Sequence, residues 1–168
     1  MTRKKIVVSD SAPSIQLAEA YRLELLPLLY EVTIPQAVFE ESQYYNEFPD
    51  AINIARATGD WLRVKKIRNK KEMLVLLKQK LGRGESEAII LCQELRADSL
   101  LTSDKYAASK ATSLGIGTIT IADVIRDAYR LKIMTASQCT SLLKTLVLQN
   151  ILNTSYIREL LKETTAWP

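Results

Sequence analysis

The feature that most limits the possible folds is an alternation of short apolar runs with helical patterns. Runs typical of strands lie at residues 6–9, 31–34, 61–67, 99–102 and 116–120. Helical patterns start after the first run at Pro13 and recur at residues 35–41, 51–57, 73–81, 85–96 and 105–114. Strands separated by such helices form a parallel sheet with helices on both faces. We therefore predict a three-layer α/β fold built on an open, mostly parallel sheet.

The last quarter of the chain has a different pattern, with three further helices expected near residues 121–132, 135–149 and 153–163. A chain of 168 residues suits one domain with a substantial core. We predict a single domain, residues 1–168, with a core of about 6–120 and a helical extension of about 121–163. The extension is more apolar than one helix face requires, so we expect it to pack over the sheet or to form part of a homodimer or partner interface.

The absence of histidine restricts the chemistry available to the chain. It excludes Ser-His-Asp and Cys-His nucleophiles, imidazole bases and histidine ligands to zinc. Cys92 and Cys139 lie among apolar neighbours and do not form a disulfide framework, which favours a reducing compartment. The first apolar run is too short for a signal peptide or a membrane span, so we expect a cytoplasmic protein without membrane contact.

Two aspartates stand where strands of the predicted sheet end. Asp10 follows the first strand and Asp104 follows the fourth. Each could be an N-cap of the next helix. The carboxyl ends of parallel strands also share one edge, where ligands bind. Carboxylates gathered there repel one another unless protons or cations compensate, and oxygen ligands suit Mg²⁺ or Mn²⁺.

Two more groups of acids lie near the starts of helices. Glu40 and Glu41 follow the second strand, and Glu85 and Glu87 lie in the segment GRGESEAII. Neighbours at these spacings point in different directions on a helix, so one of each group is expected to face inward. Glu85 is also explained by attraction to the helix N-terminus. The pattern alone leaves both choices open.

Four segments, IVVSDSAP, IPQAVFEE, GRGESEAIIL and LLTSDKYA, resemble in order and spacing the PIN-domain nucleases, in particular a PIN-like group close to the VapC-type toxins of toxin–antitoxin modules. The resemblance covers about residues 6–163. It implies four acids around one or two divalent metal ions, with catalytic and metal-binding positions at Asp10, Glu41, Glu87 and Asp104. The chain departs from the pattern at Ser14, at Ser103 and in having glutamate at position 87, which leaves the number of metal ions open.

The function implied by this resemblance is hydrolysis of RNA phosphodiester bonds with Mg²⁺ or Mn²⁺ as cofactor. A bound metal ion would lower the pKa of a water molecule, and a second could stabilise the leaving oxygen. The resemblance further implies a toxin whose partner is a small antitoxin with a segment in or near the acidic crevice. Ser11 and Thr102 could orient a carboxylate or a water through their hydroxyl groups, or could serve in turns and caps.

A cationic segment, RVKKIRNKK, supplies a candidate surface for RNA. Its six cations are Arg63, Lys65, Lys66, Arg68, Lys70 and Lys71. They could bind phosphates or simply protect an edge strand from aggregation. Tyr44, Tyr45 and Trp61 could stack on bases, although Trp61 is expected to pack under the helices.

Two other functions remain compatible with the sequence. One is a catalytically weak or inactive PIN-like module that binds RNA or protein. The other is a phosphoryl-transfer protein with Asp10 as nucleophile, which is weaker because the adjacent acid of such sites is missing. A dinucleotide-binding fold is disfavoured, since Ser-Ala-Pro-Ser stands where its glycine fingerprint would be.

Overall fold

A computed structural model describes residues 3–153 and contains a five-stranded sheet. The strands are β1 (Lys5–Ser9), β2 (Tyr30–Pro35), β3 (Arg63–Lys65), β4 (Ser99–Leu101) and β5 (Gly117–Ile119). Their order is β3-β2-β1-β4-β5, and each neighbouring pair is parallel. The predicted α/β fold with a parallel sheet is confirmed.

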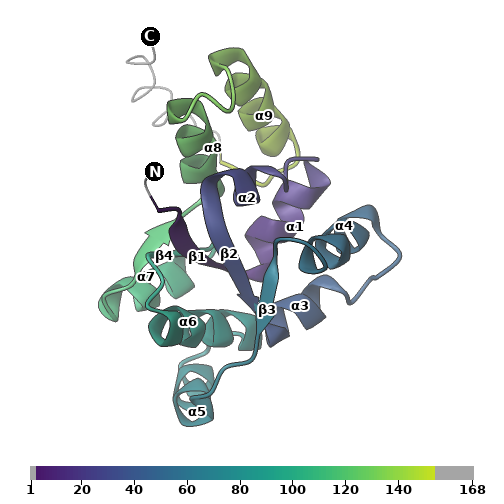
Figure 1. The fold of residues 1–168 in the computed structure, drawn as a ribbon. Coiled ribbons are helices and arrows are strands. Elements are labelled where there is room, and N and C mark those ends of the chain that lie inside the picture. Colours follow the sequence, from purple (N-terminus) through teal and green to yellow (C-terminus); the bar gives the residue numbers. More distant parts are fainter. Residues whose placement is uncertain (1–2, 154–168) are drawn as a thin grey trace. The chain divides into compact units, whose positions relative to one another are not determined.

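Helices connect the strands and cover both faces of this sheet. The first three connecting helices are α1 (Ser11–Glu19), α3 (Gln36–Ser42) and α4 (Pro49–Thr58), and the later ones are α5 (Lys70–Lys78), α6 (Arg83–Leu95) and α7 (Lys105–Ser113). α1 and α4 lie to one side of the strands and α6 and α7 to the other, with α5 against α6 (Figure 1). This follows from right-handed crossovers, because the strand order runs outward from β1 in both directions.

The structure corrects three details of the predicted elements. A short helix, α2 (Leu25–Leu29), precedes β2 and was not expected. β3 has three residues instead of seven, because the backbone N–H groups of Trp61 and Leu62 donate to Ala57 at the end of α4. α5 begins at Lys70 rather than residue 73, because Asn69 accepts a hydrogen bond from the backbone of Glu72 and caps the helix.

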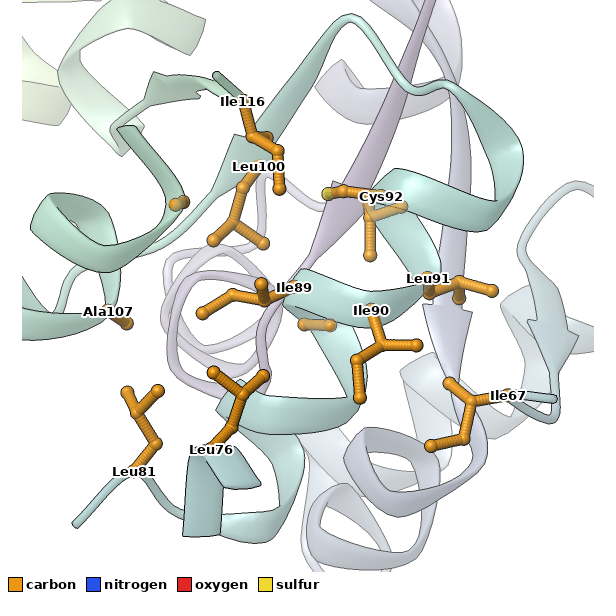
Figure 2. Close-up of a cluster of buried hydrophobic side chains, with 13 residues drawn as sticks. Ile67, Leu76, Leu81, Ile89, Ile90, Leu91, Cys92, Leu100, Ala107 and Ile116 are labelled. Atoms are coloured by element: carbon orange, nitrogen blue, oxygen red, sulfur yellow. The ribbon is translucent and has the colours of Figure 1, made fainter. Parts of the chain in front are cut away.

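The core that positions the site is organised around α6. Ile89, Ile90, Leu91 and Cys92 of this helix are buried against residues such as Leu100 of β4 (Figure 2). α6 is buried along most of its length because it contacts the sheet, α3, α5 and α7. Each buried isoleucine or leucine contributes about 1.5–3 kcal/mol relative to its exposed state. This burial holds α6 in place, and with it the N-terminal end of the helix.

The chain divides into two compact units, the first ending at Ile121 and the second beginning at Ala122. The described part of the second unit contains most of α8 (Ile121–Arg130) and α9 (Ala136–Leu148). Thr135 caps α9, as expected, by accepting a hydrogen bond from the backbone of Gln138. The helix predicted at 153–163 lies outside the described residues, and single-domain organisation stays a prediction. Within residues 3–153, no helix has the length and apolar character needed to cross a membrane.

Candidate active site

A pocket of about 350 Å³ lies where β1 and β4 end and α6 begins. Four carboxylates from separate parts of the chain line it: Asp10, Glu41, Glu85 and Asp104. Ser11, Ala12, Gly82, Gly84 and Ser103 complete its wall. Acids at the ends of two strands thus share one crevice with acids from two helices.

Asp10 is held at the junction of β1, β4 and α1. Its backbone N–H donates to Leu101 at 2.9 Å, which ties the ends of the two strands together. One carboxylate oxygen accepts from the backbone N–H of Ser11 at 2.8 Å, and the other accepts from the Thr102 hydroxyl at 3.2 Å. Asp10 therefore caps α1 and also lines the pocket.

The charge state of Asp10 reflects its crowded surroundings. Burial, together with the nearby charges of Glu85 and Glu41, raises the pKa of this carboxyl to about 6, even though hydrogen bonds from Ser11 and Thr102 act to lower it. The pocket thus gathers negative charge that the protein does not neutralise. Such a site favours a bound cation.

Asp104 also combines a cap with a place in the pocket. Its carboxylate accepts from the backbone N–H of Ala107 at 2.7 Å and caps α7. Its own backbone N–H donates to the Thr102 hydroxyl oxygen at 3.1 Å. Thr102 therefore connects Asp104 to Asp10 through one hydroxyl group.

The structure separates Glu41 from Glu40. Glu41 lines the pocket, where its carboxylate accepts from the backbone N–H of Gly84 at 3.0 Å and from the Ser11 hydroxyl at 2.8 Å. Glu40 is exposed and forms an ion pair with Arg83 at 2.8 Å. Hydrogen bonding by Gln36, together with Arg83, lowers the pKa of Glu40. Glu41, to which the resemblance assigned a catalytic and metal-binding role, is the member of this pair that lines the pocket.

The structure also separates Glu85 from Glu87. Glu85 lines the pocket and accepts from the backbone N–H of Gly82 at 2.9 Å. Glu87 is buried and does not line the pocket. Its carboxylate accepts from the backbone N–H of Ala37 at 3.0 Å, near the start of α3, and from Arg83 at 3.2 Å. The resemblance assigned a metal-ligand role to Glu87, but in the structure this side chain connects α6 to α3. Glu85, and not Glu87, lines the pocket.

Gly84 is a functional position that the sequence analysis did not single out. A Cβ atom there would lie 2.5 Å and 2.6 Å from the two carboxylate oxygens of Glu41. Glycine therefore allows the Glu41 carboxylate to approach the backbone at the start of α6. The signal for this position in the sequence was the pair of glycines on either side of Arg83 in the segment GRGE. Glycine is often required where another group approaches the backbone closely.

The donor set fits a hard divalent cation. It consists of carboxylates and hydroxyl groups, which suit Mg²⁺ or Mn²⁺, and histidine is absent from the chain. As the side chains lie, no three acidic, cysteine or histidine residues in the described part of the chain are arranged to hold a metal ion. Glu41 and Asp104 are instead bonded to backbone N–H groups. A metal ion would have to compete with these hydrogen bonds.

The six cations of the segment RVKKIRNKK are all exposed. Arg63 pairs with Glu31, and Arg68 lies 3.6 Å from Glu94. β3, which contains Arg63 and Lys65, is an edge strand of the sheet. This position agrees with a role for these cations in protecting an edge strand from aggregation. None of the six lines the carboxylate pocket, although Lys66 is close enough to Glu40 to lower its pKa.

Comparison with known families identifies the chain. A family model described as DUF3368, a PIN domain, matches residues 6–165. The chain belongs to the PIN domain family. PIN domains are generally nucleases and generally use divalent metal ions. No curated protein matches the sequence.

Two solved structures are also similar to the chain. One is a PilT N-terminus domain protein, SSO1118, from the hyperthermophilic archaeon Sulfolobus solfataricus P2, with 21% identity and a TM-score of 0.45 over 71% of this chain and 88% of that chain. Another is a domain of a functionally unknown protein from Methanocaldococcus jannaschii DSM 2661, with 22% identity and a TM-score of 0.46 over 69% of this chain and 90% of that chain.

Proposed function

We propose that this PIN domain is a divalent-metal-dependent endoribonuclease that hydrolyses phosphodiester bonds of RNA. The observation that carries the proposal is the convergence of Asp10, Glu41, Glu85 and Asp104 on one pocket. The raised pKa of Asp10 supports it, because burial first, and the charges of Glu85 and Glu41 second, disfavour a carboxylate there that has no cation beside it.

The residues of the chain have separable roles in this proposal. Asp10, Glu41, Glu85 and Asp104 would hold Mg²⁺ or Mn²⁺, which when bound supplies a water of lowered pKa as the attacking group. Thr102 fixes the Asp10 carboxylate relative to the start of α7. Ser11 fixes the Glu41 carboxylate beside the start of α1. Gly82 and Gly84 line the pocket at the N-terminus of α6, and Gly84 lets the Glu41 carboxylate approach the backbone there.

One observation favours a second candidate, a catalytically weak or inactive module that binds RNA or protein. Glu41 already has two protein donors, and Asp104 is engaged as a helix cap. If these hydrogen bonds outcompete the metal ion, the scaffold would bind without turnover. Calorimetry on the wild type and on Asp10→Asn measures metal affinity and separates the nuclease from the binding module. Low metal affinity of the wild type would favour the binding module.

The deciding experiment is cleavage of a mixed pool of single-stranded and structured RNA with Mn²⁺, Mg²⁺ or EDTA. We expect wild-type activity that requires the metal ion and is lost in Asp10→Asn. Equal background cleavage in both proteins, with and without metal, would reject the nuclease and leave the binding module.

A matched pair of variants tests which glutamate of α6 acts at the pocket. Glu85→Gln removes a charge that lines it, whereas Glu87→Gln removes a charge that contacts α3 and Arg83. We expect Glu85→Gln to lose metal-dependent cleavage. Glu87→Gln should lower the free energy of unfolding by about 1–3 kcal/mol with the metal requirement retained. The reverse result would assign the ligand to Glu87.

We further propose that the protein is the toxin of a toxin–antitoxin pair, with a small antitoxin as partner. Support comes from the order and spacing of the four segments, which resemble those of a PIN-like group close to the VapC-type toxins. Leu131 and Leu148 in the second unit are exposed apolar residues that an antitoxin or a second copy of the chain would cover. Expression of the wild type in a bacterial host should arrest growth, and expression of Asp10→Asn should not. A separate experiment, sedimentation of the purified chain, measures whether it forms a homodimer.

A further inference from the structure

A second hollow adjoins the carboxylate pocket and shares one wall with it. It has a volume of about 410 Å³, and its lining includes Glu19 of α1, Glu41 of α3, and Tyr45, Phe48 and Asp50 from the start of α4 and the segment before it. Glu41 lines both pockets. A ligand in the second hollow would therefore lie next to whatever binds among the four acids.

Two exposed aromatic rings, Tyr45 and Phe48, line this hollow, and the ring of Tyr44 contacts that of Tyr45. Tyr44, Tyr45 and Phe48 are 79%, 61% and 51% exposed. The rings of Tyr44 and Tyr45 meet edge to face with centroids 4.8 Å apart, and those of Tyr45 and Phe48 are 5.7 Å apart. Exposed apolar patches of this kind mark binding surfaces. The face of a nucleic-acid base stacks well on rings of this kind.

The charges of the hollow indicate which part of a nucleic acid it would accept. Glu19, Glu41 and Asp50 all line it. Three carboxylates repel a phosphate, so the sugar-phosphate backbone is a poor occupant. Carboxylates do accept hydrogen bonds from the exocyclic amino groups of bases, as in the recognition of cytosine by glutamate or aspartate. Uracil has no exocyclic amino group.

We propose that this hollow is a base subsite, in which Tyr45 and Phe48 stack on one unpaired base and the carboxylates select a base that carries an amino group. The inference rests on the proposed function, because it places the base beside a phosphate bound at the four acids. It makes the substrate single-stranded at that position. It predicts a preference for adenine, cytosine or guanine over uracil there.

The experiment measures binding without cleavage. The probe is a short single-stranded RNA of uridines with one 2-aminopurine, a base whose fluorescence is quenched by stacking, added to full-length Asp10→Asn with Mg²⁺. We expect quenching, and we expect adding Tyr45→Leu or Phe48→Leu to weaken binding at least about fivefold, the lower end of what one stacked base contributes. Tyr106→Leu is the matched control, since Tyr106 is also exposed but lines neither pocket.

Competition tests the base preference. A uridine strand with one adenosine should displace the probe at least about fivefold better than a strand of uridines only, and Asp50→Asn should reduce that difference. Thermal unfolding of each variant checks that it is folded. Equal displacement by both strands, or quenching unchanged by Tyr45→Leu and Phe48→Leu, would overturn the subsite.

Two further outcomes separate this inference from the proposed function and from a protein ligand. If wild type cleaves no RNA but Asp10→Asn quenches the probe in a Tyr45-dependent manner, the subsite stands and the nuclease fails. If wild type cleaves and Tyr45→Leu changes neither quenching nor KM, the subsite alone fails. Binding of a fluorescent oligoarginine peptide that requires Tyr45, with unchanged RNA quenching, would assign the hollow to a basic protein segment and overturn the base subsite.

Discussion

At the scale of single residues, Asp10 is the most constrained side chain of the site. It is buried, it joins β1 to β4, and it faces other acids. Its pKa of about 6, against an ordinary value of 3.8, means that the folded protein binds a proton there more readily than the unfolded chain does. The folded state is therefore favoured when Asp10 is protonated.

This predicts the effect of Asp10→Asn on stability. In EDTA, wild type should lose about 2 kcal/mol of unfolding free energy as the pH rises from about 4 to about 6, because Asp10 ionises at higher pH in the folded state than in the unfolded one. The variant should lack this loss and be the more stable protein at pH 7.5. Urea unfolding at pH 4, 5, 6 and 7.5 measures both curves. Parallel curves would show that Asp10 has no unfavourable charge in the folded protein.

Gly84→Ala tests the close approach of Glu41 to α6. The added methyl group would displace the flexible carboxylate, whose oxygens lie within 2.6 Å of its position. Alanine raises helix propensity by about 1 kcal/mol, which offsets the lost hydrogen bond, so stability should change by less than about 1 kcal/mol. Metal-dependent cleavage should fall at least about tenfold, since a misplaced ligand weakens the metal site.

The control for this prediction is Gly59→Ala at the end of α4. Its Cβ would meet no side chain, and its nearest neighbour would be a backbone oxygen at 3.4 Å. We expect unchanged cleavage from this variant. Full activity in Gly84→Ala would mean that the position of the Glu41 carboxylate seen here is not the one used with metal bound.

At the scale of elements, α7 depends on a cap that is also a pocket acid. Asp104→Asn keeps a side chain that caps as well as aspartate, so the free energy of unfolding should stay within about 0.5 kcal/mol of wild type. Asp104→Ala removes the cap and should cost about 1 kcal/mol. Both variants should lose metal-dependent cleavage, as each removes a carboxylate. Equal destabilisation by both, measured by urea unfolding, would mean that the charge rather than the cap stabilises α7.

The elements themselves were largely predictable because their signals are local. Pro13 and Asp10 indicate the start of α1, and Thr135 indicates the start of α9. The errors occur where contacts between residues far apart in the sequence determine the ends of an element. β3 is short partly because the backbone N–H groups of Arg68 and Asn69 bond to Glu94 of α6 and end the extended segment. No local pattern in the segment reveals that partner.

At the scale of the whole molecule, the cationic segment is the surface with the clearest prediction for RNA. Four of its residues, Lys65, Lys66, Lys70 and Lys71, form no salt bridge with another described residue. Changing all four to glutamine should weaken RNA binding and flatten the slope of log K against log salt by about 3, as expected when four phosphate contacts to a single strand are lost. Fluorescence anisotropy at several salt concentrations measures this slope.

A matched control uses the two arginines of the same segment. Arg63 and Arg68 already lie within ion-pair distance of Glu31 and Glu94, so Arg63→Gln with Arg68→Gln should change the slope less per charge removed. A salt slope unchanged by the four lysine substitutions would leave edge protection as the role of the segment.

The sequence by itself determined the parallel sheet and the edge at which Asp10 and Asp104 lie, while the pairing of β1 with β4 in the tertiary structure brings the two acids together. The carboxyl ends of parallel strands necessarily share an edge, and each acid lies within three residues of the end of a strand. Tertiary structure alone decided between neighbouring glutamates. Glu41 faces the pocket through a contact with Gly84, 43 residues away, while Glu87 is turned to the start of α3. A local pattern defines the faces of a helix, but packing against distant segments sets the rotation of that helix and thus which face meets the site.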